Sequence, residues 1–265
     1  MRVEIFDVGH GSAALAIADN TNLVMFDCGH DEGGFRPSVY LPQHWRAVQW
    51  LVVSHYDSDH VSDLAELRAQ MPIERLLSNP TITVDEIRRL KLKEGPIRPG
   101  VAALLEMKSA FGGVVNQADL AGIRVRYFYN NYSQFQDMNN LSLVTFLTYE
   151  DFCIVFPGDI ERPGWLEMLR LADFRQCLSQ VNVFVASHHG REDGYCEEVF
   201  RCCNPDIVVI SDKQIVHDTQ EHCYDNHAKG ISFSRDGQRY VLTTRSDGHI
   251  LVEKTKGSPF SIRIR

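Results

Sequence analysis

The stretch Ser54-His55-Tyr56-Asp57-Ser58-Asp59-His60 decides how this sequence is interpreted, because it places two histidines and two aspartates within six residues. Its first residue, Ser54, ends the apolar, strand-length run Trp50–Ser54. The stretch precedes VSDLAELRAQM, whose apolar residues recur at helical spacing. A loop between a strand and a helix can turn alternate side chains inward. We therefore expect His55 and Asp57 to converge on one point and Asp59 and His60 on a second.

These residue types indicate a metal centre. Imidazole and carboxylate ligands together suit zinc, manganese or iron. Two adjacent ions lower the pKa of a bound water and so provide a nucleophile at neutral pH. The alternative is a polar loop in which Asp59 stabilises the start of a helix. That alternative explains one aspartate, but not two histidines and two aspartates at alternating spacing.

Two later segments carry further candidate ligands. Asp159 follows the apolar run Cys153–Phe156 in Pro157-Gly158-Asp159, where a simple turn role is the alternative. His188 and His189 follow the apolar run Val183–Ala186 and precede a glycine. We predict Asp159 and at least one of these histidines to be metal ligands, although the spacing does not say which histidine.

The composition is that of an ordinary globular protein, with 265 residues, 44% hydrophobic residues and 23% charged residues. The net charge of −8 argues against a broad basic face for nucleic acid, but it does not exclude a nuclease. The seven cysteines include no C-x-x-C pair, which argues against a cysteine-based zinc site. The sequence shows no membrane-length apolar stretch and no secretory signal, so we expect a cytoplasmic protein without membrane contact.

The order of strands and helices predicts an α/β fold. Short apolar runs dominate the first third, and a charged helical region follows from Val84 to Ala110, broken by Gly95-Pro96 and Pro99-Gly100. Strands then return at 123–129, 141–148, 152–156, 181–186, 207–210, 239–244 and 250–253, with a helix at 164–171. This order fits two packed sheets covered by helices, a four-layer αββα sandwich, and we expect residues 1–265 to form a single domain.

The cluster resembles the H-x-H-x-D-H signature of the metallo-β-lactamase superfamily, with Asp57 where the second histidine usually stands. Phe156-Pro157-Gly158-Asp159 resembles the family's Gly-Asp motif, and the resemblance implies that Asp159 bridges two metal ions. Ser187-His188-His189-Gly190 resembles its later histidine motif. The family's fold is the same αββα sandwich.

A narrower resemblance, to the hydrolase domain of ComEC-type competence proteins, spans nearly the whole chain. It is carried by the His-His-Gly segment and by Phe6-Asp7-Val8-Gly9-His10-Gly11-Ser12, Phe26-Asp27-Cys28-Gly29 and Asn140-Leu141-Ser142-Leu143-Val144. In that branch the domain lies beside a DNA-uptake channel and is thought to act as a nuclease. The resemblance therefore implies a phosphodiesterase or nuclease, here as a stand-alone hydrolase.

Two departures from the family pattern matter. Asp57 makes the first metal position richer in oxygen, which favours manganese or iron without excluding zinc. The sequence also has no histidine between His60 and His188, so the family's third motif has no histidine to match. His188 could supply the missing ligand while His189 serves the second metal. Asp137, Asn139 or Asn140 could also stand nearby.

Other residues are candidates beside the metals. By family analogy Asp27 orients a ligand histidine, although a turn role is equally compatible, and His10 could line the mouth of the site. Lys213 and His217 could bind a phosphate or stabilise developing negative charge; a solvated loop is the alternative. The catalytic candidates are Asp59, Asp159, Lys213 and His217. The metal candidates are His55, Asp57, Asp59, His60, Asp159, His188 and His189.

The predicted function is a metal-dependent hydrolase with one or two divalent ions, zinc or manganese, with iron also compatible. The favoured substrate is a phosphodiester in DNA or a nucleotide. One alternative is the same fold acting on another ester, amide or lactone. Another is a component of a multi-protein system, such as bacterial defence, that turns over nothing until a protein partner is present.

Overall fold

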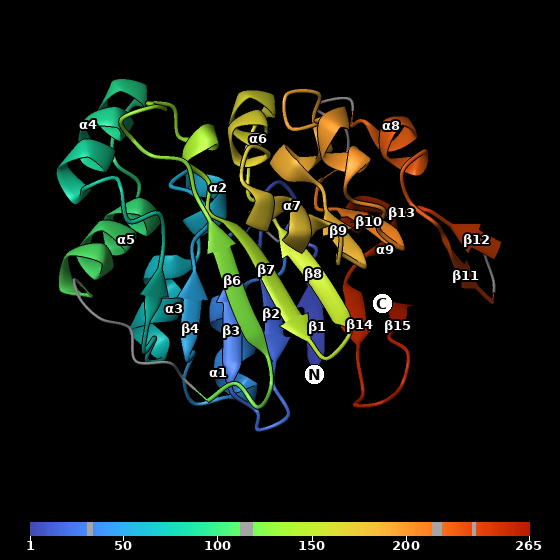
Figure 1. Cartoon of the computed structure of the whole chain (residues 1–265). Helices are drawn as coiled ribbons and strands as arrows, with labels where there is room; N and C mark the ends of the chain where they lie inside the picture. The colour runs from blue at the N-terminus through green and yellow to red at the C-terminus, as the bar shows by residue number, and fades with distance from the viewer. Residues whose placement is uncertain (31–33, 112–118, 214–218, 235–236) are drawn as a thin grey trace.

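Two β-sheets lie face to face at the centre of the computed structural model, which describes residues 1–30, 34–111, 119–213, 219–234 and 237–265 (Figure 1). Among these residues, one sheet has seven strands, in the order β15-β14-β1-β2-β3-β4-β5. The other has six strands, in the order β13-β10-β9-β8-β7-β6. A separate hairpin pairs β11 with β12.

The strands of the first sheet are β1 (Arg2–Ile5), β2 (Ala14–Ile17), β3 (Leu23–Phe26), β4 (Trp50–Val52), β5 (Leu76–Leu77), β14 (Ile250–Glu253) and β15 (Ser261–Ile264). Those of the second are β6 (Arg124–Phe128), β7 (Val144–Tyr149), β8 (Phe152–Phe156), β9 (Val183–Val185), β10 (Ile207–Ile210) and β13 (Val241–Thr243). The hairpin consists of β11 (Ile231–Phe233) and β12 (Gly237–Arg239).

Helices cover the outer faces of both sheets (Figure 1). The first half of the chain contributes α1 (Pro37–His44), α2 (Ser58–Val61), α3 (Leu64–Gln70), α4 (Val84–Glu94) and α5 (Pro99–Ala110). The second half contributes α6 (Arg162–Met168), α7 (Ala172–Leu178), α8 (Glu221–Asp225) and α9 (Thr244–Asp247). Short 3₁₀ segments are η1 (Asn139–Leu141) and η3 (Glu197–Arg201), and η2 (Ser187–Gly190) is a turn with non-helical backbone at His188 and His189. The predicted α/β fold of two sheets between helices is therefore confirmed.

Three apolar layers hold this arrangement together, and the period-2 alternation of the strands creates them. In β3, Leu23 and Met25 face the helices of the first half, whereas Val24 and Phe26 face the other sheet. In β9, Val183 and Val185 face the first sheet, whereas Phe184 packs among the helices of the second half. Each central strand is buried on both faces, which explains why these strands read as continuous apolar runs.

Strand direction determines where the polar loops meet. The pairs β3–β4 and β4–β5 are parallel in the first sheet, and β8–β9, β9–β10 and β10–β13 are parallel in the second. The segments that follow the carboxyl ends of parallel strands leave a sheet at the same edge, which is where open α/β sheets place their ligands.

The structure differs from the sequence-based expectation in several elements. The strand expected over residues 141–148 is β7, which starts at Val144, and Leu141 belongs to η1. The helix expected over residues 61–71 is α3, which starts only at Leu64, while Val61 ends α2; the Asp63 carboxylate between the two helices accepts from Ser38 and Arg36. The strand expected over residues 239–244 is β13, Val241–Thr243; Arg239 ends β12, and α9 begins at Thr244. There the Asp247 carboxylate accepts from the Thr243 amide nitrogen (2.8 Å).

Helix α4 begins with a capping box. The Thr83 Oγ1 accepts from the Glu86 amide nitrogen at 3.3 Å, and the Glu86 carboxylate accepts from the Thr83 amide nitrogen at 2.7 Å. Among the described residues, every helix falls short of the length and apolar character that a membrane crossing requires.

The rings of Phe26 and Phe156 join the two sheets, with centroids 4.0 Å apart and both side chains buried. We predict that Phe26→Ala lowers the free energy of unfolding by about 3–5 kcal/mol, because it removes a large buried ring and leaves a cavity. Urea denaturation with an unchanged m-value would measure this. Val39→Ala, at a residue that is 54% exposed, is the control and should change stability by less than about 0.5 kcal/mol. Equal effects of the two substitutions would contradict the assigned role of the Phe26–Phe156 contact.

Candidate metal centre

The candidate site lies where segments following strands of both sheets meet. Asp27 follows β3, and the segment from Ser54 to His60 follows β4. Asp159 follows β8, and His188 and His189 follow β9. A backbone hydrogen bond of 2.7 Å from the Leu143 nitrogen to the Ser54 oxygen ties the two sheets together beside these loops.

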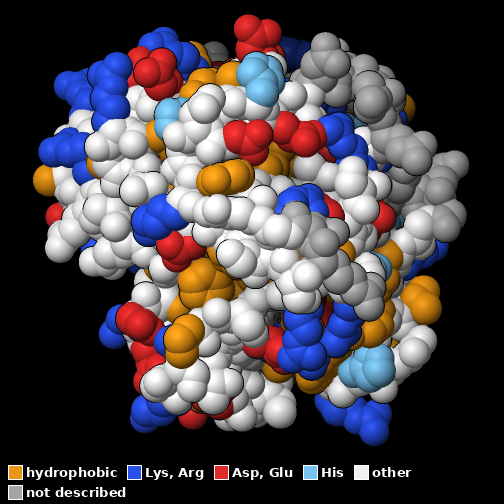
Figure 2. Space-filling view, turned by 90° about the vertical axis from the view of Figure 1, so that its right-hand side faces the viewer, with side chains coloured by type: hydrophobic (Ala, Val, Ile, Leu, Met, Phe, Trp, Pro, Cys, Tyr) orange, Lys and Arg blue, Asp and Glu red, His pale blue; other side chains and the backbone are white. Residues whose placement is uncertain are grey.

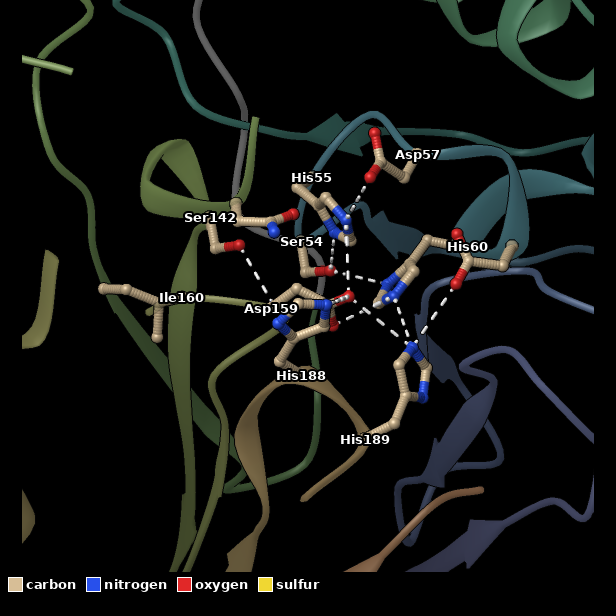
Figure 3. Close-up of polar contacts among 12 residues, drawn as sticks. Ser54, His55, Asp57, His60, Ser142, Asp159, Ile160, His188 and His189 are labelled. Atoms are coloured by element: carbon tan, nitrogen blue, oxygen red, sulfur yellow. Dashed lines mark hydrogen bonds and ion pairs between the residues drawn. The ribbon is translucent and has the colours of Figure 1, made fainter. Parts of the chain in front are cut away.

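Among the described residues, Asp59, His60, Asp159 and His189 form a group whose ligand atoms all lie within 4.8 Å of one another. His60 Nε2 is 3.1 Å from Asp159 Oδ1, and His189 Nε2 is 3.5 Å from Asp159 Oδ2. Asp59 Oδ2 completes the group at 3.4 Å from His189 Nε2. Figure 3 shows the His60 and His189 rings directed toward Asp159.

The outer nitrogens of both imidazoles are already committed to acceptors. His60 Nδ1 is 2.8 Å from Asp27 Oδ2, and His189 Nδ1 is 2.9 Å from the backbone oxygen of Ser211. Because the Ser211 carbonyl can accept but not donate, Nδ1 of His189 carries a hydrogen and Nε2 faces inward. The Asp27 carboxylate and the Ser211 carbonyl thus place the hydrogen of each ring on Nδ1. Partners of metal-ligating histidines act in the same way.

This donor set fits a divalent metal. The two inward Nε2 atoms are 3.4 Å apart, at which distance two neutral lone pairs repel. Two carboxylates face the same point, so the arrangement demands a positive charge between its members. Nitrogen and oxygen donors in this combination suit zinc, manganese or iron.

The pKa shifts have the same electrostatic cause. Although burial opposes the change, the carboxylates of Asp159 and Asp59 raise the pKa of His189 to about 10. Asp159 and Asp27 likewise hold the pKa of His60 well above its usual value against the effect of burial. The neighbouring imidazoles hold the pKa of Asp159 well below its usual range, again against burial. Protons on the histidines thus supply the positive charge that a metal ion supplies when it replaces them.

Asp27 connects the site to the first sheet. Its Oδ1 accepts from the Ser54 amide nitrogen at 2.7 Å, and its Oδ2 accepts from the Ser54 hydroxyl at 2.8 Å. The same Oδ2 faces His60 Nδ1, and Asp27 is only 3% exposed. The structure therefore places Asp27 where the family analogy implied, behind a candidate ligand histidine.

The backbone around the site is unusually constrained. His188 and His189 both have positive φ, 49° and 55°, which costs free energy for residues with a side chain. Gly29 has no such strain, but a Cβ there would lie 2.0 Å from the Asp59 backbone oxygen. A glycine is therefore required for the β3 loop to pack against the loop that carries Asp59.

The remaining predicted ligands lie beside the four-donor group and are not part of it. His55 Nε2 is buried without a hydrogen-bond partner, 3.7 Å from Asp159 Oδ2 and 3.6 Å from Asp57 Oδ2. The other oxygen of Asp57 makes a short ion pair with the Lys91 ammonium. His188 Nε2 is 3.9 Å from Asp159 Oδ2 and accepts from the Arg191 guanidinium at 3.3 Å.

A cleft of about 500 Å³ opens over these residues. Its walls include Asp59 and Asp159, together with Lys91, Arg98 and Arg191. The sequence interpretation missed Arg191, although it stands directly after the His-His-Gly segment. It also missed Lys91, which the sequence does not distinguish from its neighbour Lys93 in the charged helix.

His10 stands at the edge of the cleft. Its Nε2 accepts from Arg191 Nη2 at 3.1 Å and lies 3.5 Å from Asp59 Oδ2. Lys213 lines a neighbouring hollow of about 370 Å³ that also contains His10 and Asp59. His217 lies outside the described residues.

The residues considered as substitutes for the missing histidine have structural partners. The Asn139 side chain donates to the Glu161 carboxylate at 2.8 Å, and Asn140 Oδ1 accepts from the Gly164 amide nitrogen at 2.9 Å. Asp137 Oδ1 accepts from the Asn140 amide nitrogen at 2.7 Å. These bonds hold the start of α6 next to η1. The three side chains therefore stabilise the contact between these two segments.

Comparison with known proteins gives one family-model match and several similar solved structures. Residues 7–86 match the family model described as the metallo-beta-lactamase superfamily. The structure is similar to that of the metallo-beta-lactamase fold protein YhfI from Bacillus subtilis, with a TM-score of 0.51 at 11% identity, covering 92% of this chain and 96% of that one.

Two further solved structures are similar at lower scores. Zinc-bound PqqB from Methylobacterium extorquens gives a TM-score of 0.42 at 12% identity, covering 70% of this chain and 72% of that one. The short form of human tRNase Z gives 0.44 at 13% identity, covering 83% and 97%. No curated protein matches the sequence.

The chain has the metallo-β-lactamase fold. The match of residues 7–86 and the fold together support the metallo-β-lactamase superfamily, whose signature the segment His55–His60 resembles.

We predict that Asp27→Asn weakens metal binding about 10- to 100-fold. An asparagine can still accept from Ser54, but its amide would donate to His60 Nδ1 and so place the hydrogen of the neutral ring on Nε2. Competition with a fluorescent zinc chelator would measure the affinity. Asp206→Asn is the control, since Asp206 accepts from Asn182 and Lys229 away from the site. Unchanged zinc affinity in Asp27→Asn would contradict the assigned orientation of His60.

Proposed function

We propose that this protein is a metal-dependent phosphodiesterase or nuclease. The observation that carries the proposal is the four-donor group, Asp59, His60, Asp159 and His189, of which Asp59 and Asp159 line a cleft that also presents arginine side chains. Such a cleft can hold a metal-activated water and an anionic substrate together.

Asp59, His60, Asp159 and His189 would hold the metal. An ion there supplies Lewis acidity toward a phosphoryl oxygen and lowers the pKa of a bound water to near neutrality. Zinc, manganese and iron all suit these donors. The acceptors behind the histidines, Asp27 and Ser211, keep the ligand nitrogens directed inward.

The charges of the cleft favour an anionic substrate. Among the described residues, its walls carry four carboxylates, those of Asp57, Asp59, Glu94 and Asp159, against three cations, those of Lys91, Arg98 and Arg191. With the donor histidines neutral, a divalent ion held by the four-donor group would make this balance positive. Arg191 is fixed by its bonds to His10 and His188, so its guanidinium is already oriented in the cleft.

The reaction is hydrolysis of one P–O ester bond. The water oxygen attacks phosphorus, the bond to the leaving oxygen breaks, and the proton released by water ends on the leaving group. Asp59 and Asp159, as members of the four-donor group, would position the attacking water. Arg191 stabilises the negative charge that develops on the phosphoryl oxygens. Lys213, in the adjoining hollow, is proposed to act on the same charge, as is His217.

DNA or a nucleotide is the proposed substrate, in keeping with the resemblance to the ComEC-type branch. Acidic and basic side chains are interspersed over the described part of the face in Figure 2. Because the net charge of the chain is −8, a nucleotide or a strand end that enters the cleft suits the molecule better than a long duplex. The cytoplasm is the expected compartment, and a protein partner that triggers turnover is compatible with the proposal.

We predict that Asp159→Ala loses the bound metal and lowers phosphodiesterase kcat by about 1000-fold or more, because several kcal/mol of transition-state stabilisation disappear with the ion. The assay compares bis-p-nitrophenyl phosphate, a dinucleotide, plasmid DNA and a neutral lactone in the presence of Mn²⁺ or Zn²⁺. Asp151→Ala, at an exposed carboxylate outside the site, is the control. Full metal-dependent activity in Asp159→Ala would contradict the proposal, as would turnover of the lactone alone.

We predict that Arg191→Ala lowers kcat/KM for the phosphodiester by about 10- to 100-fold, the effect of losing a hydrogen bond to a charged group. Hydrolysis of a neutral ester, if any is found, should change much less. Arg170→Ala is the matched control, because Arg170 is paired with Glu167 on the surface. Equal losses on charged and neutral substrates would show that Arg191 acts on the integrity of the site and not on the anion.

A further inference from the structure

The first metal position of the family signature has a protein cation beside it. Lys91, on α4, directs its ammonium to Asp57 Oδ1 in a short ion pair and to Glu94 Oε2 at 2.6 Å. The Lys91 side chain is only 8% exposed, whereas lysines are rarely buried unless they are paired. The capping box at Thr83 fixes the start of α4 and hence the position of this lysine relative to the loop of Asp57.

Two of the donors that would form this position, Asp57 and His188 Nε2, already have cationic partners. Asp57 gives one oxygen to Lys91 and is not in the four-donor group. His188 Nε2 accepts from Arg191 at 3.3 Å. His55 Nε2 has no hydrogen-bond partner, but it faces Asp57 and Asp159 at 3.6 and 3.7 Å. Figure 3 shows Asp57 at the far side of His55 from His189.

The donors therefore fit one ion well and a second ion poorly. A cation at the first position would have to share Asp57 with an ammonium already in contact with it, and like charges at such a separation repel strongly in a half-buried site. Asp57 also departs from the histidine of the family signature. A neutral histidine could not compensate a buried ammonium, whereas a carboxylate can.

Resting on the function proposed above, we infer that this chain works with a single metal ion, and that the Lys91 ammonium supplies the second positive charge in place of a second ion. Lys91 lines the same cleft as Asp59 and Asp159. An ammonium is a compact point charge that binds phosphate well, so it can contact the non-bridging oxygens of the substrate. It also keeps the Asp57 carboxylate from acting as a ligand.

Metal stoichiometry tests this inference directly. The full-length chain, stripped of metal, is titrated with Mn²⁺ and separately with Zn²⁺, and bound metal per chain is measured by elemental analysis after desalting. The wild type and Lys93→Ala, an exposed lysine on the same helix, should each bind one ion. Lys91→Met keeps the apolar stem but leaves Asp57 uncompensated, and it should bind two. The double variant Lys91→Met/Asp57→Asn should return to one.

Activity gives a second measurement. Lys91→Met should lose about 100-fold in kcat at micromolar metal, the effect of removing one transition-state charge contact, and regain part of it at millimolar Mn²⁺. Circular dichroism verifies folding. If Lys91→Met does not fold, the metal stoichiometry is measured with Asp57→Asn alone. This variant should still bind one ion, with unchanged affinity.

Two outcomes would overturn the inference: two ions in the wild type, or one ion in a folded Lys91→Met. Both would leave the proposed hydrolase function intact. No bound metal in the wild type, together with no effect of Asp159→Ala, would instead overturn the proposed function and the inference with it.

Discussion

The Asp159 carboxylate lies within 4 Å of nitrogen atoms from four histidines, and the rest of the site depends on this concentration of groups. His60 approaches at 3.1 Å, His189 at 3.5 Å, His55 at 3.7 Å and His188 at 3.9 Å. Asp159 is buried, so its charge cannot be screened by water and must be balanced by a proton or a metal ion. A structure that brings these groups together is stable with a cation and costly without one.

The two sheets hold the groups around Asp159 in place. Asp27, at the end of β3, fixes both Ser54 and His60, while Ser211, beyond β10, fixes His189. The stacked rings of Phe26 and Phe156 lie just before Asp27 and Asp159 in the chain. Packing between the sheets thus sets the distance between the two halves of the donor group. The positive φ values of His188 and His189 are tolerated because packing and hydrogen bonds over-determine them.

Charge balance also explains the residues around the donor group. Carboxylates gathered for a metal repel a phosphate, so the cleft needs cations to accept an anion. Arg191 is oriented by His10 and His188, and Lys91 is oriented by Asp57 and Glu94. Each basic side chain is held by partners that limit its motion, which reduces the entropy lost when an anion binds.

The sequence by itself determined the two-sheet fold and the segments that form the site. Apolar runs of strand length, the helical spacing after His60 and the His/Asp cluster are local patterns, and local patterns can be read without coordinates. The sequence did not determine which donors share one point. The two sheets decide that, because Asp59 and His60 come from one and Asp159 and His189 from the other. Nor did it separate Lys91 from Lys93 or reveal the partner of Asp57. Those facts depend on how a helix packs beside a loop more than thirty residues away, and no local pattern records such a contact.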